Sequence, residues 1–427
     1  MRIPDRPTVI LRDVTIPCAL LDDPPTGETV LRDIALDAGR IARIAPAGVL
    51  SGEGVDLDRG MVWPGLVDLH THLDKGHIWP RAANPDGTRD GALGAVGADR
   101  DANWSAGDVR ARMEFALRCA YAQGTVAIRT HLDSIGAQPE ISWPVFVELR
   151  ERWRGRIALQ AVALFHPAAA ADDAWLVRLA DLVAAHGGIL GGVPWMDGGL
   201  HPHLDRVFTL AEQRGLDLDF HVDETGDPAA AVLRAIAETA LRRRFPGRII
   251  VGHCCSLAVQ PREDIDRTLD LVAAAGLAVV SLPMCNMYLQ DRVPGRTPRW
   301  RGVTLLHEMR ARGIAVSVAS DNCRDPFYPY GDHDMMEVYR EATRIAQLDH
   351  PVGAWPAAVA ATPADVAGFA AGRIREGAPA DLLLFRARTF NELLSRPQSD
   401  RVVLRAGRAI DRTLPDYREL DALMRTS

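Results

Sequence analysis

The sequence predicts an α/β fold, a (β/α)8 TIM-type barrel with a small β-sandwich domain formed by the N- and C-terminal segments. Through the middle of the chain, short apolar runs alternate with amphipathic stretches of helical length, which is the pattern of a parallel sheet. Histidine and aspartate follow many of these runs, and barrels of this kind carry their chemistry at the C-terminal ends of the strands. An open doubly wound sheet is the alternative, but the sequence lacks the G-x-G-x-x-G loop that it would need.

The predicted barrel occupies residues 61–371, and its strands are apolar segments of strand length. The first strand leads into an H-x-H motif, and the insertion at 74–104 is expected to be a loop over the site because it is rich in Gly, Pro and Asp. The other predicted strands are residues 125–130, 157–164, 188–193, 216–221, 248–252, 277–281 and 314–319.

The sandwich is predicted from residues 1–60 and 372–427. Short apolar runs separated by turn residues occupy both segments, for example 8–11 and 40–44 at the start and 380–385 near the end. Such runs favour β-structure, so we expect the two ends of the chain to pair into one small domain.

Composition and charge limit the class of protein. The net charge is -7 and the pI about 6.0, which argues against a nucleic-acid partner, since that requires a basic face. No apolar run approaches membrane-spanning length and no signal-peptide core is present, which argues against a membrane partner. The 6 cysteines show no C-x-x-C pattern and indicate reduced thiols. We therefore expect a cytoplasmic protein. The sequence leaves open whether the protein forms a homo-oligomer.

The segment Val67-Asp68-Leu69-His70-Thr71-His72 organises the predicted site. It follows an apolar run interrupted by Pro64-Gly65, which reads as a buried strand. Side chains two residues apart on a strand point to the same side, so His70 and His72 can bind one ion. An H-x-H motif by itself would more commonly be interpreted as two surface histidines near a turn. Compatible ligands at the ends of later strands favour the metal site.

Four side chains are predicted to bind the metal: His70, His72, His221 and Asp321. Imidazole nitrogens with one carboxylate form an N/O set that suits one divalent ion, Zn or Fe(II), better than Mg or Ca. An ion with one position left for water lowers the pKa of that water toward about 7. The set therefore predicts metal-assisted hydrolysis.

Three residues are predicted to be catalytic: Glu224, His253 and Asp321. Glu224 lies three residues past His221, beyond the strand end, where its carboxylate can move a proton to a ring nitrogen or a leaving amine. The alternative role for Glu224 is that of an acidic residue that stabilises the start of a helix, and this helix is expected to begin near Asp227. His253 is expected to orient water or polarise the substrate, and Asp321 to accept a proton from the water.

Other residues near these strand ends have predicted roles of their own. His131 is expected either to support a metal ligand or to contact substrate, and Asp74 and Asp133 to support ligands. Cys254 and Cys255 are expected to be buried packing rather than nucleophiles.

These motifs resemble the amidohydrolase superfamily and, within it, the cytosine deaminase family. The resemblance covers almost the whole chain. The Pro64–Asp74 segment is similar to the family's first metal motif, Arg129-Thr130-His131-Leu132-Asp133 to its R-T-H-x-D, and His221–Thr225 to its H-V-D-E-T. Asp321 and the segment Asp325–Pro329 resemble the metal aspartate and the D-P-W-Y-P loop. The resemblance implies a barrel, a mononuclear iron or zinc site, and Glu224 as the proton-shuttling glutamate.

Three departures from the family pattern concern the substrate-binding residues. His166 stands where the family has its cytosine-reading glutamine, Asn322 replaces an acid, and Phe327 replaces the Trp of the loop. A site that hydrogen-bonds a substrate edge discriminates strongly, so these changes affect the choice of substrate. The sequence predicts a hydrolytic, cytosine deaminase-like deaminase of an amino-substituted N-heterocycle. The alternatives are a pterin, isoguanine or triazine substrate, hydrolysis of a cyclic amide or N-alkylamine, and a non-catalytic scaffold.

Overall fold

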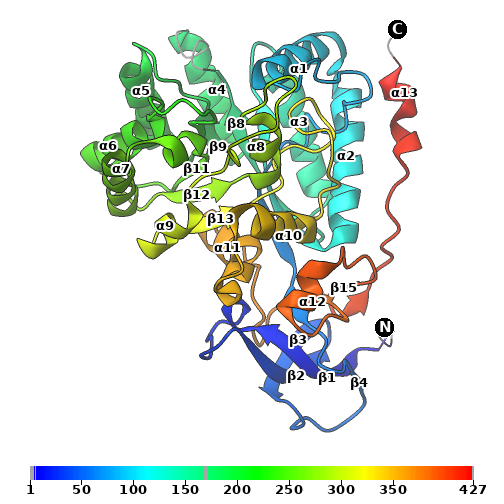
Figure 1. Ribbon diagram of the computed structural model, residues 1–427. Coiled ribbons are helices and arrows are strands. Elements are labelled where there is room, and N and C mark those ends of the chain that lie inside the picture. Colours follow the sequence, from blue (N-terminus) through cyan, green and yellow to red (C-terminus); the bar gives the residue numbers. More distant parts are fainter. Residues whose placement is uncertain (1–3, 5, 167–171, 426–427) are drawn as a thin grey trace. The chain divides into compact units, whose positions relative to one another are not determined.

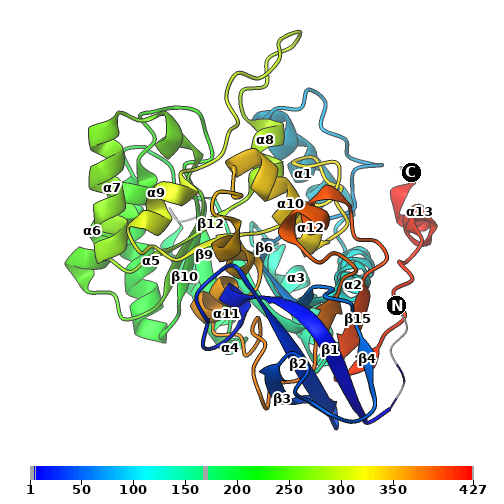
Figure 2. The same cartoon turned by 60° about the horizontal axis from the view of Figure 1, so that its bottom comes forward.

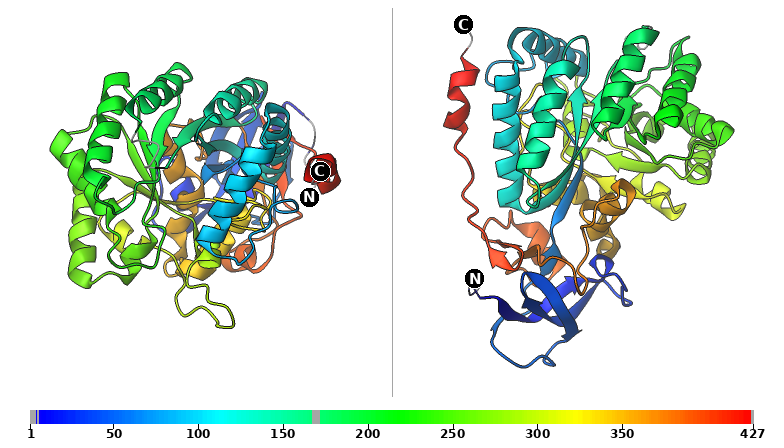
Figure 3. Two further views of the ribbon diagram at one scale, coloured as in Figure 1. Left: turned by 90° about the horizontal axis from the view of Figure 1, so that it is seen from above. Right: turned by 180° about the vertical axis from the view of Figure 1, so that it is seen from behind.

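The computed structural model describes residues 4, 6–166 and 172–425. The chain forms two compact units, which Figures 1 to 3 show in several views. The first unit comprises Met1–Asp68, Arg118–Ala127 and His333–Pro415. The second comprises Leu69–Leu117, Ile128–Asp332 and Asp416–Ser427. Each unit is described separately below.

An eight-stranded parallel sheet forms a nearly closed barrel, as the sequence predicts. Its strand order is β13-β12-β11-β10-β9-β8-β7-β6, and an isolated parallel bridge joins Thr71, at the end of β6, to Asp321, just after β13. The strands in chain order are β6 (Leu66–Thr71), β7 (Thr125–Asp133), β8 (Ala158–Leu164), β9 (Ile189–Gly192), β10 (Leu218–Val222), β11 (Ile249–His253), β12 (Ala278–Ser281) and β13 (Val316–Val318).

The barrel strands are almost entirely buried, because they are covered by side chains on both faces. Helices α4 to α7 lie outside the strands in Figures 1 and 3. The helices that follow barrel strands are α3 (Pro139–Arg152), α4 (Asp173–Ala185), α5 (Leu200–Arg214), α6 (Val232–Arg243), α7 (Arg262–Ala274), α8 (Pro283–Leu289) and α9 (Leu306–Ala311). This alternation places the C-terminal ends of the strands at one end of the barrel.

The insertion between β6 and β7 differs from the predicted loop, because it contains a helix of 15 residues, α1 (Arg89–Asn103). The Thr88 side chain accepts a hydrogen bond from the backbone N–H of Gly91 and caps the helix. The Gly-rich composition concealed this helix, since Gly lowers helix propensity by about 1 kcal/mol per residue. Buried ion pairs with Asp99 hold the helix in place. The next helix, α2 (Ala106–Gln123), precedes β7.

The first unit contains two four-stranded sheets, ordered β3-β2-β1-β4 and β16-β15-β14-β5. Figure 2 shows β1, β2 and β3 side by side. Their strands are β1 (Thr8–Pro17), β2 (Thr29–Asp37), β3 (Arg40–Pro46), β4 (Gly54–Asp56), β5 (Val62–Pro64), β14 (Leu382–Leu384), β15 (Val402–Arg405) and β16 (Arg408–Ala409). Apolar residues of both sheets, such as Leu11, Ile34 and Leu384, share one core. The predicted sandwich of the two termini is confirmed, and the exact domain boundaries stay a prediction.

The remaining helices are short. The first unit has α10 (Met335–Ala346), α11 (Ala361–Ala367) and α12 (Phe390–Ser395), and the second has α13 (Asp421–Met424) near its end. Among the described residues, every helix is too short or too polar to cross a lipid bilayer. All 6 cysteines are buried thiols.

Candidate active site

The structure brings His70, His72, His221 and Asp321 together at one end of the barrel. His70 lies on β6, His72 follows it, and His221 lies on β10. The backbone N–H of Asp321 donates to the carbonyl of His70 at 2.8 Å, and the N–H of His72 donates to the carbonyl of Asp321 at 3.3 Å. The parallel bridge between neighbouring strand ends therefore places the carboxylate beside the two histidines.

The ligand atoms of this cluster have the spacing that a metal ion requires. Nε2 of His221 lies 3.1 Å from Nε2 of His70 and 3.2 Å from Nε2 of His72. Oδ1 of Asp321 lies 3.6 Å from Nε2 of His70 and 3.3 Å from Nε2 of His72. Ligands about 2.1 Å from a tetrahedral ion are separated by about 3.4 Å. These four side chains therefore fit one small divalent cation.

The electrostatics of the cluster also favour a cation. Burial, and then the neighbouring histidines, hold the pKa values of His70 and His221 well below the usual value. Burial lowers the pKa of His72 as well, followed by the charge of Lys75. Neutral imidazoles present lone pairs, which is the form that binds a metal. Burial, and then Glu224, raises the pKa of Asp321, and a bound cation would reverse that effect.

Glu224 lies just past β10, and both of its carboxylate oxygens have partners. Oε2 lies 3.3 Å from Nε of Arg89. Oε1 accepts from Nδ2 of Asn286 at 3.3 Å and lies 3.4 Å from Nδ1 of His253. The side chain of Glu224 is only 10% exposed, so it is held at the cavity wall rather than in solvent.

His253 ends β11 and lies beside Glu224. Nδ2 of Asn286 lies 2.9 Å from its Nδ1. Within the described parts of the chain, nothing hydrogen-bonds Nε2 of His253, which leaves this atom available to a water or a substrate. Burial is the largest cause that lowers the pKa of His253, which keeps the imidazole neutral.

The alternative role of Glu224, an acid at the start of a helix, is filled by its neighbour. The carboxylate of Asp223 accepts the backbone N–H groups of Val232 and Leu233 at 3.0 and 2.9 Å, at the first residues of α6. The helix begins at Val232 and not near Asp227. Glu224 is therefore left to face the cavity.

His131 lies within the barrel beside the histidine cluster. Its ring centroid is 3.9 Å from that of His70, and its Nε2 lies 3.3 Å from Oδ1 of Asp219. Arg129 donates from Nη1 to the other oxygen of Asp219 at 2.9 Å. This arrangement favours the supporting role among the two predicted for His131.

The three predicted substrate-binding residues line one cavity together with the catalytic groups and three of the four predicted ligands, His72, His221 and Asp321. His166 follows β8, and Asn322 and Phe327 follow β13. Asn322 donates from Nδ2 to Asp325 at 2.7 Å, which orients its amide. Among the described residues, the lining is His72, Lys75, Arg89, Leu93, Val96, Arg100, Asp133, Ile135, Leu164, Phe165, His166, Val193, Trp195, His221, Glu224, His253, Asp321, Asn322 and Phe327.

A buried charged group forms one wall of this cavity. Lys75, the single lysine of the chain, places Nζ 3.0 Å from Asp133 and 5.0 Å above the ring of Phe327. Asp74 accepts the backbone N–H of Asp133 at 2.8 Å, and burial, followed by the charge of Asp133, raises the pKa of Asp74 to about 7. The supporting role of Asp74 and Asp133 stays a prediction.

Sequence reasoning missed Arg89, Trp195 and Asn286. Arg89 is the first residue of α1, and Asn286 lies on α8, which follows β12. The strand-end rule would have found Asn286, since it comes five residues after Ser281, and Trp195, since it comes three residues after β9. Arg89 carried no such signal because it lies in the insertion.

Cys254 and Cys255 are buried, and burial raises the pKa of each thiol well above its usual value. A thiol in this state is a poor nucleophile, since the thiolate is the reactive form. The two residues are therefore packing, as the sequence predicts.

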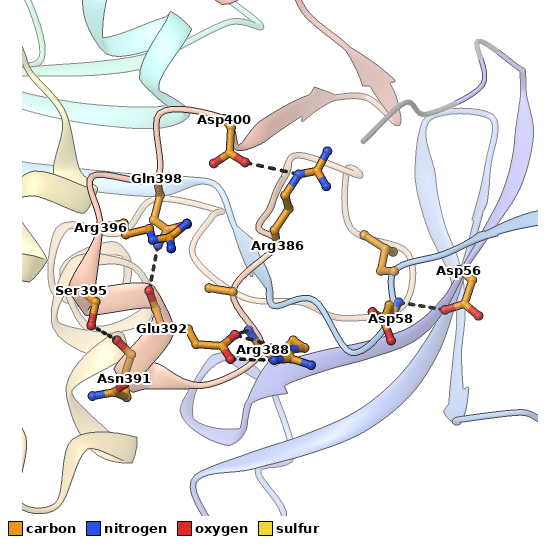
Figure 4. A pocket seen from close by; sticks show the side chains of 12 residues that line it. Asp56, Asp58, Arg386, Arg388, Asn391, Glu392, Ser395, Arg396, Gln398 and Asp400 are labelled. Carbon is orange, nitrogen blue, oxygen red and sulfur yellow. Dashed lines mark hydrogen bonds and ion pairs between the residues drawn. The ribbon is translucent and has the colours of Figure 1, made fainter.

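Figure 4 shows a larger hollow in the first unit, and two ion pairs lie in its lining. Nε of Arg386 lies 3.3 Å from Asp400, and Nη2 of Arg388 lies 2.9 Å from Glu392. Its lining contains no histidine or cysteine among the described residues. The barrel cavity is therefore the candidate active site.

A barrel with a histidine and aspartate cluster at its strand ends defines a metal-dependent hydrolase. The sequence pattern of the amidohydrolase family matches residues 116–411, and the chain belongs to this family. It is a hydrolase that acts on C–N bonds other than peptide bonds, as predicted.

Three known proteins show the degree of similarity. A pterin deaminase of Rhizobium rhizogenes (strain K84) is 54% identical over 430 residues, which cover 99% of this chain and 98% of that protein. The structure of 5-methylcytosine deaminase from Klebsiella pneumoniae with 5-fluorocytosine has a TM-score of 0.81 and 22% identity, over 96% of this chain and 98% of that one. That of N-isopropylammelide isopropylaminohydrolase from Burkholderia multivorans has a TM-score of 0.73 and 27% identity, over 94% and 97%.

Proposed function

We propose that this enzyme hydrolytically deaminates a pterin and releases ammonia. The observation that carries this proposal is the 54% identity to a pterin deaminase over nearly the full length of both proteins. Pterin is one of the alternative substrates that the sequence predicts, and the identity to a pterin deaminase supports it better than cytosine. The replacement of the family's cytosine-reading glutamine by His166 agrees with this change of substrate.

His70, His72, His221 and Asp321 would hold one divalent ion, Zn or Fe(II). Their spacing and their neutral, buried imidazoles support this assignment. Such an ion activates water for attack at neutral pH. Purification without chelators, followed by elemental analysis, tests the site and should find about one ion per chain.

The residues around the ion would move the protons. Glu224 takes a proton from the attacking water and delivers it to a ring nitrogen of the substrate, next to the amino-bearing carbon. Asp321 accepts the remaining proton of the water, and this proton passes through Glu224 to the departing amino group, so that the oxo product and ammonia balance the reaction. His253 directs Nε2 toward the water and the reacting carbon.

Three residues are proposed to bind the heterocycle. Phe327 offers its ring face for stacking, and Lys75 lies on that ring. His166 and Asn322 would contact the polar edge of the substrate, since both line the cavity. The enclosed site would limit the access of bulk water to the reacting carbon.

Ammonia release from a panel of heterocycles tests the proposed function. Pterin should give the highest kcat/KM, above cytosine, isoguanine and an aminotriazine. A second candidate is hydrolysis of an N-alkylamine, which the similarity to an N-isopropylammelide isopropylaminohydrolase favours. Release of isopropylamine from N-isopropylammelide, without ammonia from pterin, would establish that candidate instead.

The cellular location and the oligomeric state of the protein are also proposals. The composition supports a cytoplasmic enzyme that acts on a small heterocyclic substrate without nucleic-acid or membrane partners. Sedimentation of the full chain would show whether it forms a homo-oligomer.

A further inference from the structure

Asn286 is a buried polar side chain that contacts two of the proposed catalytic residues. It lies on α8, the helix that follows β12, and it is fully buried. Its Nδ2 reaches both Glu224 and His253. It is not among the described residues that line the cavity, so it lies behind the site rather than against the substrate. A group in this position acts on the reaction through the side chains that it orients.

Glu224 determines which end of the Asn286 amide faces these two residues. Oε1 of Glu224 lies 3.3 Å from Nδ2 of Asn286. Nε of Arg89, another donor, lies 3.3 Å from the second oxygen, Oε2. A carboxylate oxygen accepts hydrogen bonds and does not donate them, so the amide turns its NH2 group toward Glu224 and its oxygen away.

The same NH2 group leaves only one tautomer of His253 that fits. Nδ2 of Asn286 lies 2.9 Å from Nδ1 of His253, and a donor at this distance requires a lone pair on Nδ1. An imidazolium has hydrogen on both nitrogens and could not accept here. A neutral ring with hydrogen on Nδ1 would face the NH2 group with a second donor. The remaining form has its hydrogen on Nε2, the nitrogen that no described residue hydrogen-bonds.

We propose that Asn286 is a positioning residue that, oriented by Glu224, holds His253 as the tautomer with hydrogen on Nε2. This inference rests on the proposed function, because it assigns His253 a part in the same reaction. It makes His253 a hydrogen-bond donor rather than a base.

The donor acts on the oxygen of the attacking water. One nitrogen of His253 and one oxygen each of Glu224 and Asp321 lie within 4.8 Å of one another, so the ring lies beside both groups that move protons. Nε2–H donates to the oxygen and stabilises the negative charge that develops there as the last proton leaves for Asp321. The hydrogen of His253 is not transferred, and the proton transfers stay with Glu224 and Asp321.

The tautomer can be measured in ¹⁵N spectra of the full chain labelled in histidine and reconstituted with Zn²⁺. A ring nitrogen that carries hydrogen and one that does not are distinct, and the signals of His253 are those that His253→Ala loses. Wild-type protein should show hydrogen on Nε2 and none on Nδ1. Asn286→Leu and Asn286→Asp should both place hydrogen on Nδ1, because each leaves it facing carboxylate oxygens that only accept, such as Oε1 of Glu224 at 3.4 Å.

The kinetic effect should fall on kcat. Losing one donor to a developing negative oxygen lowers kcat by about 100- to 1000-fold. KM for pterin should stay near the wild-type value, since Asn286 is outside the cavity lining. In a His253→Ala background, Asn286→Leu should have little further effect, because residues that act as a unit are not additive. Asn391→Leu and Asn391→Asp are the matched controls, at an exposed position outside the lining, and should keep wild-type values.

The spectra require no turnover, so they test the inference separately from the proposed function. Hydrogen on Nδ1 of His253 in the wild-type protein overturns the inference, and so does an unchanged tautomer in a folded Asn286 variant. Additive losses of kcat in the two single variants and the double variant also overturn it, since they would mean that Asn286 acts without His253. If wild-type enzyme releases no ammonia from pterin, the proposed function itself fails.

Discussion

At the scale of single residues, Glu224 and Asp223 show how neighbours with the same chemistry take different roles. The carboxylate of Asp223 points to the start of α6 and accepts two backbone N–H groups. Glu224, one residue later, faces Arg89, Asn286 and His253. The backbone of Asp223 has φ = 51°, a left-handed conformation that reverses the direction of the chain between the two side chains.

Glu224→Gln should retain the metal but lower kcat by orders of magnitude. The amide is similar in shape to the carboxylate but cannot accept and return a proton, so positioning survives while proton transfer is lost. Ammonia release and elemental analysis measure the two effects. Glu238→Gln on α6 serves as the control, since the Glu238 side chain is 41% exposed and lies outside the cavity lining. A Glu224→Gln enzyme with near-normal kcat would remove Glu224 from the mechanism.

Asp321→Ala should lose both the metal and the activity. Removing this carboxylate takes away one of the four proposed ligands and the negative charge of the cluster. We expect well below one ion per chain by elemental analysis, together with no measurable ammonia release. Full metal content in the variant would show that Asp321 is not a ligand.

At the scale of elements, close packing between β11 and β6 orients the histidine cluster. Gly252 on β11 lies against His70, and an added Cβ would lie 2.8 Å from Cε1 and 3.0 Å from Nδ1 of that ring. The imidazole would have to move to accommodate it. A glycine at this position therefore allows the strand to approach the predicted ligand.

Gly252→Ala should lower the affinity for the metal by about 10- to 100-fold, the usual effect of disturbing the surroundings of a ligand. Titration of the metal-free enzyme with Zn²⁺ measures the change. Gly94→Ala is the control, because Gly94 is an exposed position of helix α1 and an added Cβ there would meet no side chain and no other segment within 4 Å. Equal affinities in the two variants would contradict the prediction.

Helix α1 is held by a buried ion-pair cluster that the sequence did not reveal. Arg81 donates from Nε and Nη2 to the two oxygens of Asp99 at 2.8 and 2.9 Å. The same carboxylate accepts from Nε1 of Trp104 at 2.7 Å. Because Arg81 and Asp99 are both buried, neither charge is compensated by water.

Asp99→Ala should destabilise the protein by about 3 kcal/mol or more, because it leaves the buried charge of Arg81 with fewer partners. Asp101→Ala, two residues away on the same helix, should cost less than about 1 kcal/mol, since its side chain is 77% exposed. Urea unfolding of both variants measures the difference. Equal stabilities would show that the cluster does not hold the helix.

At the scale of the whole molecule, buried histidines make stability depend on pH. His333 belongs to the first unit and is 2% exposed. Burial lowers its pKa from 6.5 to about 4. The unfolded chain therefore binds a proton that the folded chain does not bind between these two values. The stabilising contribution is complete above pH 6.5 and is lost as the pH falls toward 4.

We expect wild-type protein to lose up to about 3 kcal/mol more than His333→Leu between pH 7 and pH 4. The measurement is the free energy of unfolding of both proteins at several pH values. The difference between the two proteins removes the contribution of the other histidines. A difference that does not change with pH would contradict the assignment to His333.

The barrel and most of the cavity could be predicted from the sequence because their signals are local. The two-residue spacing of His70 and His72, and the polar residues that follow later strands, are visible without any long-range information. Position within a strand then implies position in the barrel, since parallel strands end on the same side.

What the sequence alone determined is the alternation of strand and helix, the sandwich of the two termini, and the residue types able to bind a metal. Only the tertiary structure decided that α1 forms within a glycine-rich insertion, that Arg89 reaches Glu224 and Trp195, and that Asp223 takes the helix end. The physical reason is that periodicity and strand ends are properties of adjacent residues. Contacts between residues 89, 195 and 224 depend on how distant segments pack, and no local pattern records that packing.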